Sequence, residues 1–275
     1  MRHGACTWIF GDQPLPDIAQ RLAAAGADGM ELMGNLEAYP PGKVNACLRE
    51  SGLKVLSLTP ENVDLAHPDP QVRSQALEYY YRLLDLAAEV GNPVVCCHGA
   101  VGRIRAIGPH EDERRWFLLG VQRIAERAGQ AGLRIALEVL NRYEAHLLNT
   151  AGEALAFARE VGADNVGLLL DCYHMNIEEE DLRSAIGTAG DRLFLFHAAD
   201  SNRQAVGRGH TDWPGVLRAL RDARYTGDLV LECTAPGPDP FTPIKGEGWQ
   251  EMVWQYVEES LRYLELLERQ VGLTG

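Results

Sequence analysis

The chain has no long apolar segment, no surplus of basic residues and no C-x-x-C pair of cysteines. None of its apolar stretches approaches the ~20 residues needed to cross a bilayer. Its 275 residues carry 26 Lys and Arg against 39 Asp and Glu, and the net charge of −13 disfavours binding to a phosphate backbone. Because the first residues show no apolar run before a small-residue cleavage site, we expect no signal peptide and a cytoplasmic protein. Membrane proteins and nucleic-acid binders are therefore disfavoured.

The cysteines are few and lack the spacing of a metal-binding motif. No two of them form a C-x-x-C pair, so neither a zinc finger nor a disulfide framework is indicated, and we expect small buried side chains. The six positions are Cys6, Cys47, Cys96, Cys97, Cys172 and Cys233.

Short apolar runs alternate with longer amphipathic stretches from end to end. The expected strands are residues 4–10, 29–33, 54–59, 93–98, 134–140, 166–172, 193–198 and 228–234. The expected helical segments are residues 16–25, 44–51, 70–90, 112–131, 151–161, 181–188, 213–223 and 249–270. Eight β-then-α units in a chain near the ~250 residues typical of such folds predict one (β/α)₈ TIM barrel domain over residues 1–275. An open doubly wound sheet is the alternative, but no glycine-rich phosphate turn follows the first strand.

Four consecutive predicted strands each place one ligand-type side chain inside an apolar run near the carboxyl end. These side chains are Glu138, Asp171, His197 and Glu232. Burying carboxylates without compensation costs several kcal/mol each, so a bound divalent cation is the economical explanation. Oxygen donors with one imidazole suit Mn²⁺, Co²⁺ or Mg²⁺, and the lack of thiolates disfavours structural zinc.

The alternation of side chains along a strand supports this arrangement. The residues flanking each of the four are apolar, so period-two alternation turns the four toward the barrel mouth. Active sites of such barrels lie at that face. A buried polar network without a metal is the alternative interpretation.

Several runs resemble the D-tagatose/D-allulose (psicose) 3-epimerase family of xylose isomerase-like TIM barrels. The runs are EVLNRYE at 138–144, LNT at 148–150, LDCYHMNIEE at 170–179, DSNR at 200–203, GRGHTDW at 207–213 and GDLVLE at 227–232. The resemblance extends roughly from Arg134 to Glu232 and implies the same four metal ligands. It also implies that Glu138 and Glu232 form the acid/base pair.

The resemblance further implies that Glu144, His174 and Arg203 contact the substrate. From the residues alone, His174 lies in a loop above the metal and could instead orient a ligand carboxylate. Arg203 could pair with a surface acid, and Glu144 could pair with Arg142. The first half of the chain, including the loops near Glu61 and His98, matches none of these runs.

The predicted activity is metal-dependent interconversion of C3 epimers of free ketoses. The pairs in question are of the D-tagatose/D-sorbose, D-fructose/D-allulose or L-ribulose/L-xylulose type, and the route is deprotonation and reprotonation through a metal-bound cis-enediolate. An aldose–ketose or hydroxypyruvate-type isomerase on the same barrel is the alternative. A DNA-repair endonuclease is disfavoured by the charge, and a sugar-binding barrel without catalysis is disfavoured by the paired glutamates.

The last predicted helix is apolar over a wide arc. One face must cover the barrel, and the surplus predicts a homodimer or homotetramer.

Overall fold

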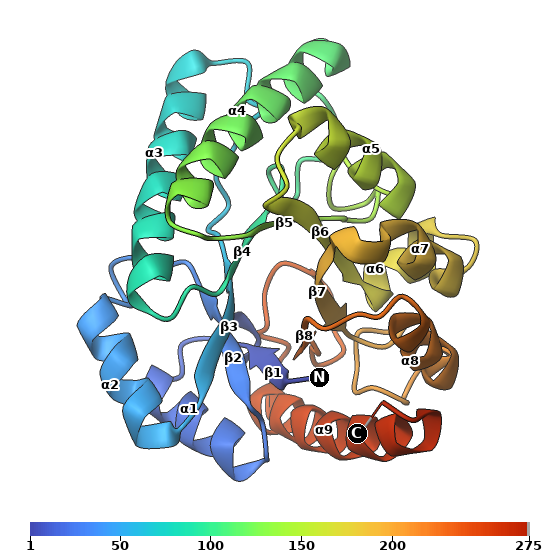
Figure 1. Ribbon diagram of the computed structural model, residues 1–275. Helices are drawn as coiled ribbons and strands as arrows, with labels where there is room; N and C mark the ends of the chain where they lie inside the picture. The colour runs from blue at the N-terminus through green and yellow to red at the C-terminus, as the bar shows by residue number, and fades with distance from the viewer. Residues whose placement is uncertain (274–275) are drawn as a thin grey trace.

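The computed structural model describes residues 1–273, and its eight strands close into a parallel barrel (Figure 1). The order around the ring is the order in the chain, and β1 closes the ring on β8 with Gly4 opposite Val230. The predicted single barrel fold is confirmed. The strands are β1 His3–Cys6, β2 Gly29–Met33, β3 Lys54–Thr59, β4 Val94–Cys97, β5 Ile135–Glu138, β6 Val166–Asp171, β7 Leu193–Ala198 and β8 Asp228–Leu231.

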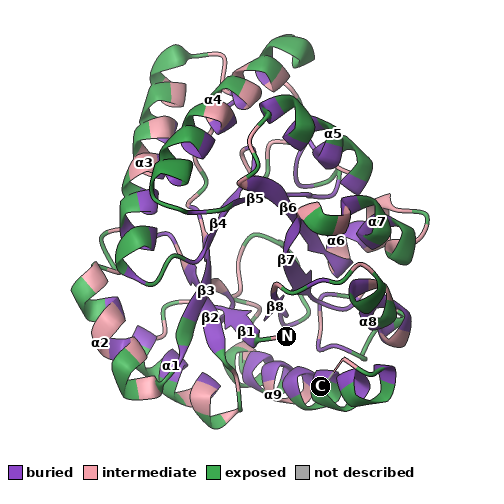
Figure 2. Cartoon of the chain, viewed as in Figure 1, coloured by how far each residue is buried: buried purple, intermediate pink, exposed green. Residues whose placement is uncertain are grey.

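Helices surround the strands, with their buried residues toward the strands and their exposed residues outward (Figure 2). The α-helices are α1 Leu15–Ala24, α2 Pro41–Ser51, α3 Pro70–Glu89, α4 His110–Gln130, α5 Ala151–Val161, α6 Cys172–Glu178, α7 Leu182–Ala189, α8 Trp213–Asp222 and α9 Trp249–Val271. Two 3₁₀ segments are η1 Thr7–Phe10 and η2 Gly190–Arg192. Among residues 1–273, no helix combines the length and apolarity needed to span a membrane.

Several strands end earlier at the catalytic end than the sequence-based expectation: the fifth at Glu138, the eighth at Leu231, and the first and sixth as follows. The first strand stops at Cys6, and the remainder of the predicted strand folds into η1. The sixth strand stops at Asp171, whose carboxylate accepts a hydrogen bond from the backbone N–H of Tyr173 at 2.6 Å. This N-cap starts α6 directly at the strand end.

The floor of the barrel is packed around two glycines on neighbouring strands. A Cβ on Gly4 would lie 2.6 Å from the carbonyl oxygen of Gly29 and 2.7 Å from Leu56 Cδ1. A Cβ on Gly29 would lie 2.4 Å from the carbonyl oxygen of Lys54. Only residues without a side chain let β1, β2 and β3 approach so closely while Leu56 fills the interior.

The last helix covers the barrel as expected. In Figure 1, α9 lies between α1 and α8 at the edge of the barrel. Trp254 stacks on Phe10 with ring centroids 3.9 Å apart, and Arg21 of α1 makes a bidentate ion pair with Glu251. The opposite face of α9 leaves Tyr263 and Leu266 partly exposed.

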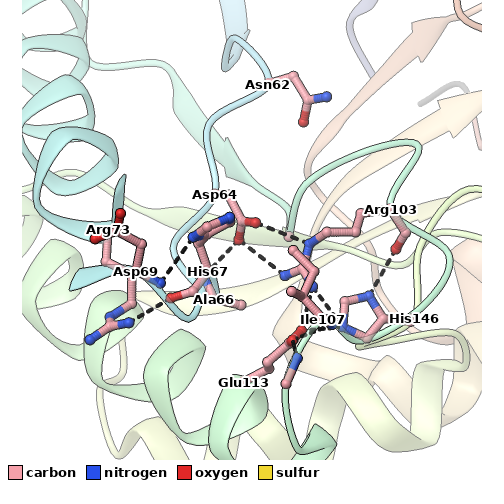
Figure 3. A network of polar contacts seen from close by, with 12 residues as sticks. Asn62, Asp64, Ala66, His67, Asp69, Arg73, Arg103, Ile107, Glu113 and His146 are labelled. Atoms are coloured by element: carbon pink, nitrogen blue, oxygen red, sulfur yellow. Dashed lines mark hydrogen bonds and ion pairs between the residues drawn. The ribbon is translucent and has the colours of Figure 1, made fainter. Parts of the chain in front are cut away.

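A polar network ties together the loops that follow β3, β4 and β5 (Figure 3). Arg103 binds Asp64 and Glu113, and Glu113 also accepts from His146 at 2.8 Å. Glu113 is fully buried at the start of α4 and accepts the backbone N–H groups of residues 107 and 108. We call these four side chains the loop network.

Candidate active site

A cavity of about 760 Å³ opens at the carboxyl ends of the strands. It is lined by predicted site residues and by residues of the loops after β1, β2, β3, β4 and β8. The predicted residues on its surface are Glu138, Glu144, His174, Arg203 and Glu232. The position agrees with the catalytic face of this fold.

Three of the four predicted metal ligands converge on one point. Asp171 ends β6, His197 lies opposite it in β7, and Glu232 directly follows β8. One donor atom from each lies within 4.8 Å of the others. His197 Nδ1 is 3.9 Å from Asp171 Oδ2 and 3.8 Å from Glu232 Oε2. The fourth, Glu138, ends β5 and lines the same cavity.

These donors suit a divalent cation. Asp171 Oδ2 and His197 Nδ1 are buried, and within the part of the chain that the structure describes neither has a hydrogen-bond partner. Buried polar atoms without partners are rare because each costs free energy. Carboxylate oxygens with one imidazole nitrogen are donors typical of Mn²⁺, Co²⁺ or Mg²⁺ sites.

The two predicted catalytic glutamates have opposite protonation tendencies. Burial raises the pKa of Glu138 to about 8. Burial also opposes ionisation of Glu232, but the charges of Arg203 and His197 outweigh it and hold the pKa of Glu232 well below its usual value. One carboxyl thus favours the neutral acid and the other the carboxylate, which is the asymmetry that acid/base catalysis needs.

The remaining two members of the cluster are also perturbed. Burial and the neighbouring Glu232 raise the pKa of Asp171 well above its usual value. Burial disfavours the His197 imidazolium, but the carboxylates of Glu31 and Glu232 outweigh it and raise the pKa of His197. Such excess negative charge at one point is what a bound cation would neutralise.

Glu232 is held from two sides. Arg203 Nη2 donates to Glu232 Oε2 at 2.6 Å, and Trp8 Nε1 donates to Glu232 Oε1 at 2.9 Å. The alternative in which Arg203 pairs with a surface acid is therefore wrong. Arg203 Nε and Nη1 are buried and lack partners among residues 1–273, which leaves them able to donate to a ligand.

The loop after β7 presents Arg203 in a constrained conformation. Arg203 has φ 59°, a backbone region that non-glycine residues rarely adopt. Buried Asp200 organises this loop by accepting the backbone N–H of Ser201 and Gly207 and the indole N–H of Trp213. The loop therefore behaves as a preformed support for the guanidinium.

Asn141 joins the other two predicted substrate-binding residues. Its Oδ1 accepts the N–H of Tyr143, so its Nδ2 faces Glu144 Oε1 at 3.0 Å and His174 Nδ1 at 2.7 Å. Glu144 does not pair with Arg142, which binds Glu178 instead. The expectation that His174 lies in a loop is also wrong, because the Asp171 cap places it in the first turn of α6.

His174 is a neutral hydrogen-bond donor in this arrangement. Burial and the nearby charge of Arg203 together lower the pKa of His174 to about 3. Because the Nδ1 atom accepts from Asn141, the proton of the neutral ring lies on Nε2. That Nε2 is buried and unpaired within residues 1–273.

Sequence reasoning missed Glu31, which is fully buried in β2 and lies 3.0 Å from His197 Nε2. The signal was available, because Glu31 interrupts the apolar run of residues 29–33 as Glu138 interrupts its own strand. It also missed the contact of Trp8 with Glu232, which no local pattern encodes. His98 lines the cavity, and its Nδ1 donates to the carbonyl oxygen of Gly99.

Ionisable side chains gathered at the carboxyl ends of the strands of a closed parallel barrel are the arrangement seen at the active sites of enzymes with this fold. The sequence profile described as xylose isomerase-like TIM barrel matches residues 19–262.

Individual relatives agree with that profile. D-psicose 3-epimerase of Ruminiclostridium cellulolyticum is 33% identical over 247 residues, covering 86% of this chain and 82% of that protein. The D-psicose 3-epimerase of Agrobacterium fabrum is 47% identical over 137 residues, but the match spans only 50% of this chain and 45% of that protein. The 3-dehydro-D-guloside 4-epimerase of Escherichia coli is 30% identical over 249 residues, covering 87% of this chain and 95% of that protein.

A solved structure of D-psicose 3-epimerase with D-tagatose from Clostridium cellulolyticum H10 has a TM-score of 0.86 at 26% identity, covering 97% of this chain and 99% of that one. The chain therefore belongs to the xylose isomerase-like TIM barrel family, and it is an isomerase of the epimerase kind. The predicted resemblance to ketose 3-epimerases is confirmed.

Proposed function

We propose that the protein is a divalent-metal-dependent ketose 3-epimerase. Glu138, Asp171, His197 and Glu232 hold one cation, with Mn²⁺ expected and Co²⁺ or Mg²⁺ as alternatives. The observation that carries the proposal is the pair of buried carboxyls in one cavity, Glu138 and Glu232, whose pKa values lie on opposite sides of their usual range. A ketose epimerase needs one acid and one base, on opposite faces of the reacting carbon.

The bound cation would supply Lewis acidity at the substrate carbonyl. Glu232 is the proton acceptor, because Arg203 and Trp8 stabilise its carboxylate. It removes the proton from C3, next to the ketone, and leaves an enediolate. Glu138, which favours the neutral acid, returns a proton to the opposite face. The two residues exchange roles when the other epimer is the substrate.

Three side chains orient the sugar. The Nε2–H of His174 and the free N–H groups of Arg203 donate to hydroxyl oxygens. Glu144, 3.7 Å from Arg203 Nη1 and hydrogen-bonded to Asn141, accepts from a hydroxyl. A sugar presents both donors and acceptors on one face, so this mixed set suits it.

The test measures the exchange of sugar-bound hydrogen with solvent deuterium. NMR in D₂O of the Mn²⁺-loaded enzyme, freed of excess metal, is expected to show deuterium at C3 and a new epimer with D-fructose, D-tagatose or L-ribulose. Glu138→Gln and Glu232→Gln should each lower kcat by about 10²–10⁴-fold, because each removes one proton-transfer group. Glu160→Gln, on the exposed face of α5, is the control.

An active Glu138→Gln or Glu232→Gln enzyme would overturn the assignment of that residue. Deuterium at C1, or at C2 of an aldose product, would favour the isomerase alternative.

A second candidate is epimerisation at C4 of a glycoside that carries a 3-ketone. Two observations favour it. The aligned region covers 95% of the length of the E. coli 4-epimerase, and the lining of the 760 Å³ cavity includes Asn35, Tyr39 and Phe241. Such a volume lies in the range that binds ligands larger than a monosaccharide. A methyl 3-oxo-glucoside added to the same experiment decides between them, because exchange at C4 with none in free ketoses would select this candidate.

Two further properties stay predictions. We expect a cytoplasmic protein, and we expect a homodimer or homotetramer in which the exposed face of α9, including Met252 and Leu266, contributes to the interface. Light scattering on the purified protein would give the assembly state.

A further inference from the structure

A further buried carboxylate, in addition to the three among the predicted metal ligands, lies behind their cluster. Glu31 belongs to β2, has no exposed surface, and is 166 residues away in sequence from the histidine that it contacts. Its Oε2 lies 3.0 Å from Nε2 of His197, on the side of the ring that faces away from Asp171 and Glu232. The two ring nitrogens of His197 thus meet different surroundings.

Strands on both sides hold the Glu31 carboxylate in place. Ser57 of β3 donates to its Oε2 at 2.7 Å, and the thiol of Cys6 donates to its Oε1 at 3.1 Å. The Cys96 thiol lies 3.6 Å from Oε2. Each of these neighbours is a donor, so the carboxylate of Glu31 acts as the common acceptor. Contacts from several strands leave it little freedom to rotate.

This group is a hydrogen-bond cluster rather than a second metal site. Donor atoms of Cys6, Glu31 and His197 do lie within 4.8 Å of one another. The Cys6 thiol, however, uses its proton on Glu31, and burial raises the pKa of Cys6 well above its usual value. A metal would need the thiolate.

An ionised carboxylate only accepts hydrogen bonds, so Nε2 of His197 must be the donor in this contact. In the neutral ring the lone pair is then on Nδ1, which faces Asp171 and Glu232 and has no partner within residues 1–273. We propose that Glu31 is a positioning residue that holds His197 in the Nε2–H tautomer, with Nδ1 directed at the divalent cation. The inference rests on the proposed metal centre and deepens it.

A carboxylate on the far nitrogen of a ligating histidine fixes the ring orientation and raises its basicity. Cation affinity should therefore depend on Glu31, although Glu31 does not itself touch the cation.

The loop network contains a matched pair that lacks this role (Figure 3). Glu113 is also fully buried and also binds a histidine Nε2, that of His146, at 2.8 Å. The Nδ1 of His146 lies 2.8 Å from the carbonyl oxygen of Arg103, so this ring has no free lone pair. Loss of Glu113 should affect the fold and leave cation affinity unchanged.

The experiment compares Glu31→Gln with Glu113→Gln by titrating Mn²⁺ into each purified, metal-stripped protein and measuring free Mn²⁺ by electron paramagnetic resonance. We expect Glu31→Gln to raise the Kd by about 10–100-fold, because a glutamine amide can donate to Nε2 and select the wrong tautomer. Glu113→Gln should bind as the wild type does.

Separate outcomes identify which proposal fails. Wild-type affinity in folded Glu31→Gln would overturn the role of Glu31 alone. A wild-type protein that binds no Mn²⁺ would overturn the metal centre and the role of Glu31 with it.

If Glu31→Gln does not fold, the wild type still answers the question. In ¹⁵N-histidine-labelled protein loaded with Zn²⁺, we expect the His197 proton on Nε2, with its signals assigned by their loss in His197→Gln. A proton on Nδ1 would overturn the proposal.

Discussion

A single amide, that of Asn141, determines which atoms two neighbouring side chains offer to a ligand. Its Nδ2 donates to Glu144 and to His174 Nδ1, because its Oδ1 is already used by the N–H of Tyr143. His174 must then present Nε2–H to the cavity. A charged imidazole is avoided, since burial and the nearby charge of Arg203 lower the pKa of His174 to about 3.

Replacing His174 should affect substrate binding according to whether the new side chain can donate. We expect His174→Phe to raise KM by about 5-fold, the equivalent of one neutral hydrogen bond of about 1 kcal/mol. His174→Gln keeps an N–H donor and should retain most of the affinity. Steady-state kinetics measures both, with thermal unfolding as the check on folding. Equal KM values for the two variants would contradict a donor role.

At the scale of elements, local patterns do not predict how the loops contact one another. The loop network joins the loops after three consecutive strands. Arg103 and Glu113 lie ten residues apart in the sequence and bind each other, and Arg103 also binds Asp64. Burial alone would raise the pKa of Glu113. Hydrogen bonds from the Gly108 N–H, Arg103 and His146 outweigh it and lower this pKa to about 2.

The lowered pKa of Glu113 predicts that the fold becomes less stable in acid. A carboxyl whose pKa is lower in the folded than in the unfolded state stabilises the fold at pH values above its unfolded-state pKa, which is 4.5 here. This contribution is lost as the pH falls toward 2. The difference corresponds to about 3 kcal/mol. Glu113→Gln should therefore reduce the free energy of unfolding at pH 7 and flatten its decline between pH 5 and pH 3. Denaturant unfolding across that pH range measures it, and parallel curves for both proteins would rule the effect out.

At the scale of the whole molecule, the barrel concentrates negative charge on its axis. Glu138 and Glu232 line one cavity, buried Asp171 lies close to Glu232, and Glu31 lies on the other side of His197. Arg203 offsets part of this charge. A cation that binds only the folded barrel would stabilise it by mass action.

Addition of Mn²⁺ at about 100 times its Kd should stabilise the fold by about 2.7 kcal/mol and raise Tm by roughly 5 °C. Chelation should reverse the shift and remove activity. Asp171→Asn is the control, because asparagine can still cap α6 but supplies no charge to the cation. Differential scanning calorimetry gives the stabilisation and the Tm shift of both proteins. A Tm shift in Asp171→Asn equal to that of the wild type would argue against Asp171 as a ligand.

Local patterns were sufficient to predict the barrel, and they also led to the proposal of four metal ligands. Alternation of apolar runs with amphipathic stretches defines β-then-α units, and period-two alternation determines which side chains face the barrel mouth. Glu138, Asp171, His197 and Glu232 each interrupt an apolar run near its carboxyl end, so their positions could be inferred one strand at a time.

Contacts between distant strands could not be inferred in this way. Glu31 meets His197 across 166 residues, and Trp8 meets Glu232 across 224. The face of a strand follows from its own residues, but the partner across the ring depends on closure of the barrel and on the stagger between strands. For the same reason, the pKa shifts of these carboxyls and imidazoles could not be inferred from the sequence, because protonation responds to neighbours that the linear sequence keeps apart.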